Sequence, residues 1–122
     1  MEKSALVYAY LGDAIYELYI REFLIEKGIV KVNELQKQSV SYVSAKAQAK
    51  FLRELINKDF FNDEELSIIK NARNHKSHSS KSTDILTYKH ATALEAIIGY
   101  LYYQKDKKRI EQIINEIKLM EV

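Results

Sequence analysis

Apolar residues along the chain recur mostly at helical spacing, and the short alternating runs that predict strands are absent. No proline and only three glycines interrupt the 122 residues. The pattern predicts an all-α fold in a single domain over residues 1–122. Six helices are expected: about residues 4–27, a stretch that starts near 33, then 44–60, 63–74, 84–104 and 106–120.

Several predicted helix ends carry local signals. Gly28 is typical of a residue that ends a helix, and Ser44 of one that caps the start of the next. Asn62 followed by Glu65 has the spacing of a capping box, in which each side chain bonds to the backbone of the other. Residues 75–82, HKSHSSKS, are polar throughout and are expected to form a loop.

The first and fifth predicted helices are apolar on nearly all sides, a pattern typical of buried helices. The run VYAYLGDAIYEL in the first helix nevertheless contains Asp13, and ATALEAIIGYLYY in the fifth has one charged residue, Glu95. Gly12 precedes Asp13, and Gly99 lies one turn after Glu95. Because glycine lets two helix backbones approach closely, we expect these helices to cross there, with both carboxylates buried and converging.

A buried carboxylate must be compensated, either by a cationic side chain or by a metal ion. Carboxylate oxygens without any cysteine suit Mg²⁺, or Mn²⁺ in its place. An ion pair with lysine or arginine is the alternative for each carboxylate. Glu17, one turn after Asp13, is a candidate third ligand, although an ion pair with Arg21 at i,i+4 is favoured for it.

A basic segment, Lys70–Lys81, contains no acidic residue. Lysine, arginine, serine and asparagine side chains can contact an RNA backbone without reading sequence. A solvated surface loop is the alternative interpretation. The candidate RNA-binding residues are Arg73, Asn74, Lys76, His78 and Lys81.

The histidines and tyrosines receive plainer interpretations. A zinc site built from His75, His78 and His90 is disfavoured, since two of them lie in the predicted loop and no cysteine assists. Most of the nine tyrosines fall in the two apolar helices, where core and interface packing is expected, with hydroxyl groups reaching polar partners.

Composition narrows the class of protein. The 47% of hydrophobic residues suffices for a core, and a net charge of +2 identifies no partner by itself. Asp13 and Glu17 interrupt the longest apolar stretch, so no membrane-spanning segment is predicted. The N-terminus lacks the pattern of a signal peptide, and we expect a cytoplasmic protein.

Two segments resemble those of the ribonuclease III family. YLGDAIYEL, residues 10–18, is similar to the family signature, and LEAIIGYLYY, residues 94–103, is similar to its second acidic motif. The order and separation of the motifs, with the basic segment between them, also fit. The short chain is expected to leave no room for a double-stranded-RNA-binding domain. In this combination of motifs and length, the chain resembles the Mini-ribonuclease III group.

The resemblance implies a ribonuclease III-like helical bundle and a Mg²⁺-dependent endoribonuclease that cuts double-stranded RNA and leaves 5′-phosphate and 3′-hydroxyl ends. Asp13 and Glu95 match the two metal-binding catalytic carboxylates. The resemblance further implies a homodimer formed through the signature helix. Its substrate would be the precursor of 23S ribosomal RNA, and a large-subunit ribosomal protein would be an assisting partner.

The chain also departs from the longer family members. An acid that they carry before the signature has no counterpart in residues 6–9, and Thr92 stands where they have an acid three residues before Glu95. Waters, RNA phosphates or Glu17 would therefore complete the metal shell.

The excess apolar surface of the first helix predicts a two-fold interface. Two other functions remain open at this point: a non-catalytic helical module that binds RNA or a ribosomal partner, and a helical protein–protein adaptor. The candidate interface residues are Tyr8, Leu11, Ile15 and Tyr19.

Overall fold

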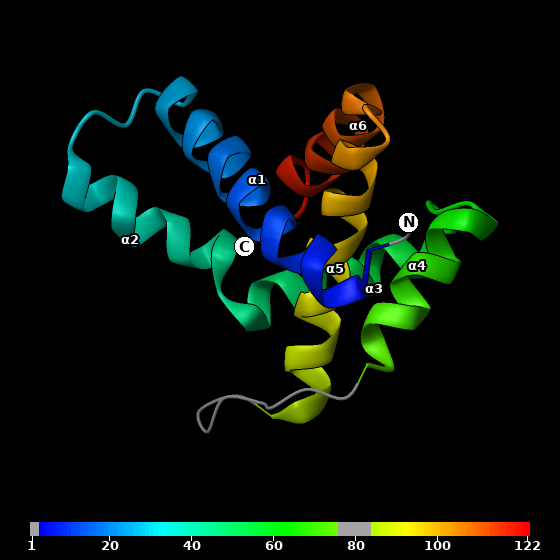
Figure 1. Ribbon diagram of the computed structural model, residues 1–122. Coiled ribbons are helices and arrows are strands. Elements are labelled where there is room, and N and C mark those ends of the chain that lie inside the picture. The colour runs from blue at the N-terminus through cyan, green and yellow to red at the C-terminus, as the bar shows by residue number, and fades with distance from the viewer. Residues whose placement is uncertain (1–2, 76–83) are drawn as a thin grey trace.

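The computed structural model describes residues 3–75 and 84–122, which form six helices and no strand (Figure 1). The predicted all-α class is therefore confirmed. The helices are α1 (Ala5–Glu26), α2 (Val32–Val43), α3 (Ala45–Asn57), α4 (Asp63–Arg73), α5 (Ile85–Tyr103) and α6 (Lys107–Lys118).

Most helices begin and end close to the predicted residues because the local signals act as expected. Helix α3 was predicted to reach residue 60 but ends at Asn57, since Asp59 has a φ of +54° that leaves the helical conformation. The Ser44 side chain accepts a hydrogen bond from the Ala47 backbone at the start of α3. Asn62 and Glu65 form the predicted capping box of α4. Gly28, just beyond α1, has a φ of +93°, a left-handed conformation that glycine adopts without strain.

Helix α5 runs through the middle of the molecule and packs against α1, α3, α4 and α6 (Figure 1). Most of its residues from His90 to Leu101 are buried, as expected for a helix that is apolar on all sides. Helix α6 contributes only one face to the core, through the four isoleucines that its amphipathic pattern predicts: Ile110, Ile113, Ile114 and Ile117.

Glycine determines how closely α1 approaches α5. A Cβ atom on Gly12 would lie 1.7 Å from the backbone carbonyl oxygen of Glu95, and one on Gly99 would lie 1.9 Å from that of Tyr8. No larger residue fits at either position unless the helices separate. The predicted crossing is therefore confirmed.

A partly buried ion pair joins α4 to α6. Arg109 Nε lies 2.7 Å from a Glu65 carboxylate oxygen, and its Nη2 donates to the Phe60 carbonyl oxygen at 2.8 Å. Glu65 thus serves the capping box and the interhelical contact together. Within the described part of the chain, no helix combines the length and apolarity needed to cross a bilayer.

Candidate metal and catalytic site

Asp13 on α1 and Glu95 on α5 meet at the glycine crossing. Gly12, which precedes Asp13, packs on the backbone of Glu95 itself, and the two carboxyl groups are within hydrogen-bonding reach of each other. The predicted convergence of the two carboxylates is thus confirmed. The two residues lie far apart in the sequence, and the close contact between α1 and α5 brings their backbones together.

The burial of the two carboxyl groups differs from the prediction. Glu95 is mostly shielded from solvent, whereas Asp13 is exposed. The expectation that both are buried is wrong for Asp13 because α1 lies at the surface and covers α5 with one face only. The pair therefore reaches from the interior to the solvent.

The electrostatic environment of Glu95 opposes its ionisation. Burial, followed by the nearby Asp13 carboxylate, raises the pKa of Glu95 from 4.5 to about 8, and a hydrogen bond from Gln48 partly offsets this rise. Two carboxyl groups that share one location favour a bound proton or a bound cation, since either reduces their mutual repulsion.

No cationic side chain in residues 3–75 or 84–122 forms an ion pair with Asp13 or Glu95. The ion-pair alternative for these two residues is therefore not supported. Glu17 pairs with Arg21 at 3.1 Å, as the i,i+4 spacing favours. Among the described residues, no cluster of three histidine, aspartate or glutamate side chains is arranged to hold a metal, so Glu17 does not complete one with Asp13 and Glu95.

Gln48 on α3 is a site residue that the sequence reasoning missed. Its side chain is 3% exposed, and its Nε2 donates to the Val43 carbonyl oxygen at 2.9 Å. The sequence signal was a glutamine on the apolar face of an amphipathic helix, in line with Phe51, Leu52 and Leu55. An amide at a core position requires partners, and here one of them is Glu95.

Comparison with known proteins identifies the family. Residues 6–106 match the Ribonuclease III domain. The chain belongs to the ribonuclease III family. Relatives named Mini-ribonuclease 3 are 44% identical in Staphylococcus aureus, over 93% of this chain and 86% of that protein, and 50% identical in Brevibacillus brevis, over 93% and 84%. A crystal structure of a Fusobacterium nucleatum protein has a TM-score of 0.83 and 39% identity, covering 92% of this chain and 90% of that one.

The basic segment of this ribonuclease III family member lies only partly within the described residues. Arg73 is half-buried at the end of α4, and Asn74, which follows it, is exposed. Lys76, His78 and Lys81 lie outside the described residues. His90 is buried in α5 with its Nδ1 2.8 Å from the Leu86 carbonyl oxygen, a contact within its own helix.

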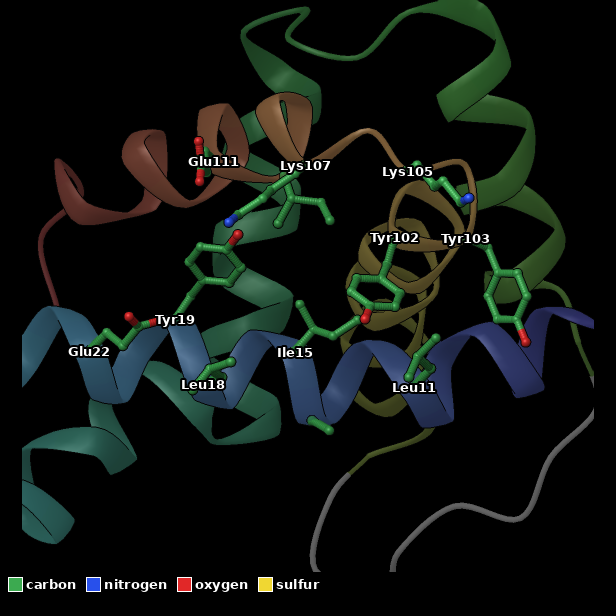
Figure 2. A pocket seen from close by; sticks show the side chains of 12 residues that line it. Leu11, Ile15, Leu18, Tyr19, Glu22, Tyr102, Tyr103, Lys105, Lys107 and Glu111 are labelled. Atoms are coloured by element: carbon green, nitrogen blue, oxygen red, sulfur yellow. The ribbon is translucent and has the colours of Figure 1, made fainter.

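An open apolar groove runs between α1 and the corner where α5 meets α6 (Figure 2). Leu18 and Tyr102 remain more than half exposed there. Leu11, Ile15 and Tyr19, which were predicted at an interface, line this groove. Charged side chains at its rim are Glu22, Lys105, Lys107 and Glu111.

The tyrosines divide in a way that the sequence pattern did not predict. Tyr8 belongs to the core, where it packs edge-on against the rings of Tyr100 and Tyr103, and unlike the other three interface candidates it does not line the groove. Tyr10, two residues later, points to the opposite side of α1 and is 83% exposed, which excludes it from the core. Tyr16 is fully buried and donates to the Tyr42 carbonyl oxygen at 2.7 Å, as expected for a core tyrosine.

Proposed function

We propose that this protein is an endoribonuclease that hydrolyses double-stranded RNA with Mg²⁺ held by Asp13 and Glu95. Membership of the ribonuclease III family supports an endoribonuclease acting on double-stranded RNA. The observation that carries the metal assignment is a mostly buried carboxyl group next to an exposed one, with no lysine or arginine paired to either among the described residues.

The residues present fit a hard divalent cation. Both are carboxylates, the chain has no cysteine, and Mg²⁺ prefers oxygen ligands, several of which are commonly water. Mn²⁺ accepts the same ligands. When bound, Mg²⁺ would supply charge neutralisation at the phosphate and a lowered pKa for a coordinated water.

The chain's own residues have distinct roles in this proposal. Asp13 is exposed and lies where an RNA phosphate can approach. The close contact between α1 and α5 involves the backbone of Glu95, so it fixes the position from which this side chain extends. Because burial and the nearby Asp13 raise the pKa of Glu95 to about 8, cation binding at neutral pH is expected to release a proton from the pair.

Asp13→Asn and Glu95→Gln test the assignment, with Glu17→Gln as a matched control one turn along α1. Each change at Asp13 or Glu95 is expected to abolish cleavage of a double-stranded RNA and to weaken Mg²⁺ binding, with the helical content unchanged. The control is expected to remain active because Glu17 pairs with Arg21 away from the site. Near-normal turnover in either site variant would refute the metal assignment.

The groove between α1 and the α5–α6 corner supports a homodimer as the active form. A second copy related by a two-fold axis brings the same apolar surface to itself. The charges at the rim of the groove are complementary in such a dimer, because Lys107 of one copy can face Glu22 or Glu111 of the other. Sedimentation at micromolar concentration tests this, and a clean monomer would refute it.

The basic segment, Lys70–Lys81, which begins in the last turn of α4, is proposed to hold the RNA backbone. Lys76, His78 and Lys81 follow Arg73 and Asn74 in the sequence. Clustered cations gain affinity for duplex phosphates by releasing counterions, and a dimer offers two such segments to one duplex. This contact requires no base recognition.

A finer proposal concerns the substrate and the products. The resemblance to Mini-ribonuclease III supports the precursor of 23S ribosomal RNA as the substrate, with a large-subunit ribosomal protein as an assisting partner in the cytoplasm. Hydrolysis would leave a 5′-phosphate and a 3′-hydroxyl. Mapping the ends produced on a ribosomal RNA precursor tests this. A non-catalytic RNA- or ribosome-binding module is not favoured, since both carboxylates are present and converge.

A further inference from the structure

Gln48 carries an unsatisfied buried acceptor. Among the described residues, its Oε1 is the one buried side-chain oxygen or nitrogen without a hydrogen-bond partner. Leaving such a group unpaired costs about 1–3 kcal/mol. A residue that merely filled the core at this position would be less costly as leucine or methionine, so the amide calls for a further explanation.

The neighbours of Gln48 place its side-chain amide beside the candidate metal site. The amide nitrogen donates to the Val43 carbonyl oxygen at 2.9 Å, and the same side chain hydrogen-bonds to Glu95. The Val43 carbonyl oxygen can only accept, so exchanging the amide nitrogen and oxygen would break that contact. The orientation of the Gln48 amide is therefore determined. The same amide group that contacts Glu95 carries the unpaired Oε1.

The candidate site is short of protein ligands. No third carboxylate or histidine of the described residues joins Asp13 and Glu95, and Glu17 is engaged by Arg21. A cation held by two carboxylates retains waters, each of which needs acceptors for its hydrogens. Gln48 Oε1 is an acceptor that the described part of the protein leaves unused.

We propose that Gln48 is a positioning residue of the metal site, whose amide N–H orients the Glu95 carboxylate and whose Oε1 accepts a hydrogen bond from water in the shell of the bound cation. This inference rests on the proposed function, since it requires a cation at Asp13 and Glu95. It gives α3 a role at a site that α1 and α5 otherwise form.

Mn²⁺ binding without RNA, followed by the electron paramagnetic resonance signal of the free ion, separates this role from packing. Gln48→Met keeps the length of the side chain but removes donor and acceptor, and it is expected to weaken binding about tenfold or more. Gln48→Glu keeps an acceptor but removes the amide donor to Glu95, so it is expected to bind Mn²⁺ more weakly than the wild type and more tightly than Gln48→Met. Gln36→Met makes the same glutamine-to-methionine change at an exposed position of α2, and it should not alter Mn²⁺ binding.

Unchanged affinity in Gln48→Met would overturn the proposal, and equal losses in Gln48→Met and Gln48→Glu would overturn the role of Oε1. A second measurement uses the wild-type protein, so it does not depend on whether a variant at position 48 folds. The side-chain amide signals of Gln48 in a ¹⁵N–¹H spectrum of the wild type are expected to shift on addition of Mg²⁺. This shift should disappear in Glu95→Gln.

The two proposals fail in different ways. If the wild type binds neither Mn²⁺ nor Mg²⁺, or if Glu95→Gln binds them equally well, the metal assignment itself is wrong and the inference about Gln48 falls with it. If the wild type binds Mg²⁺ through Asp13 and Glu95 while the Gln48 amide signals stay unchanged, only the role of Gln48 is refuted.

Discussion

Replacing Glu95 with glutamine is expected to stabilise the metal-free protein at neutral pH while it abolishes cleavage. The wild-type carboxyl group lies in the interior next to Asp13, and both features oppose its ionisation. Glutamine has nearly the same shape and cannot ionise. Its amide can also donate a hydrogen bond to Asp13, as the protonated Glu95 carboxyl group does. Glu95 is therefore expected to lower the free energy of unfolding of the metal-free protein.

The size of the effect follows from the pKa of Glu95, which burial and Asp13 raise from 4.5 to about 8. Between these values the folded state retains a proton that the unfolded chain has released, so the free energy of unfolding falls as pH rises through this interval. Each pH unit contributes about 1.4 kcal/mol, and the two and a half units from pH 4.5 to 7 give about 3 kcal/mol. For a chain of this size, that raises the Tm of Glu95→Gln by about 10 °C.

Thermal unfolding followed by circular dichroism in a chelator, at several pH values between 5 and 8, measures this difference. The stability advantage of Glu95→Gln should be small at pH 5 and grow towards pH 8. Glu26→Gln, which removes an exposed carboxylate from α1, should show no such growth. Excess Mg²⁺ should stabilise the wild type and not Glu95→Gln. A variant no more stable than the wild type at pH 7, with the same pH dependence, would refute the reasoning.

Three other predictions concern the crossing, the groove and the basic segment. Gly12→Ala should destabilise the fold by about 3 kcal/mol or more and reduce cleavage, because its Cβ would lie 1.7 Å from a backbone oxygen of α5. Leu18→Asp should shift a dimer to monomer in sedimentation, since Leu18 is 57% exposed in an apolar groove. Neutralising Lys76 and Lys81 together in a catalytically inactive variant should weaken RNA binding and flatten its salt dependence, while thermal stability stays nearly unchanged.

Matched controls make these outcomes specific. Gly28→Ala introduces a side chain into open space at a φ of +93°, so it should cost only about 1 kcal/mol and leave cleavage intact. Val40→Asp places a charge at a site on α2 that is 58% exposed, and it should not alter the association state. An unchanged salt slope after the double lysine change would mean that the segment is a connector only.

The helices and several of their ends could be predicted from the sequence alone, because the causes of these ends are local. The caps at Ser44 and at Asn62 with Glu65 involve residues within three positions of one another. Gly28 ends its helix through its own backbone freedom. The pairing of apolar helices at Gly12 and Gly99 was also predictable, since small residues on two buried helices leave few other ways to pack.

Which side chains face solvent was decided only by the tertiary structure. Asp13 and Glu95 have similar apolar neighbours in sequence, yet the first is exposed and the second mostly buried, because α5 is covered on all sides and α1 is not. The same long-range packing put Tyr8 in the core, left Leu18 at the surface and brought Gln48 of α3 to Glu95. Such placements depend on which helix covers which face, and local periodicity does not contain that information.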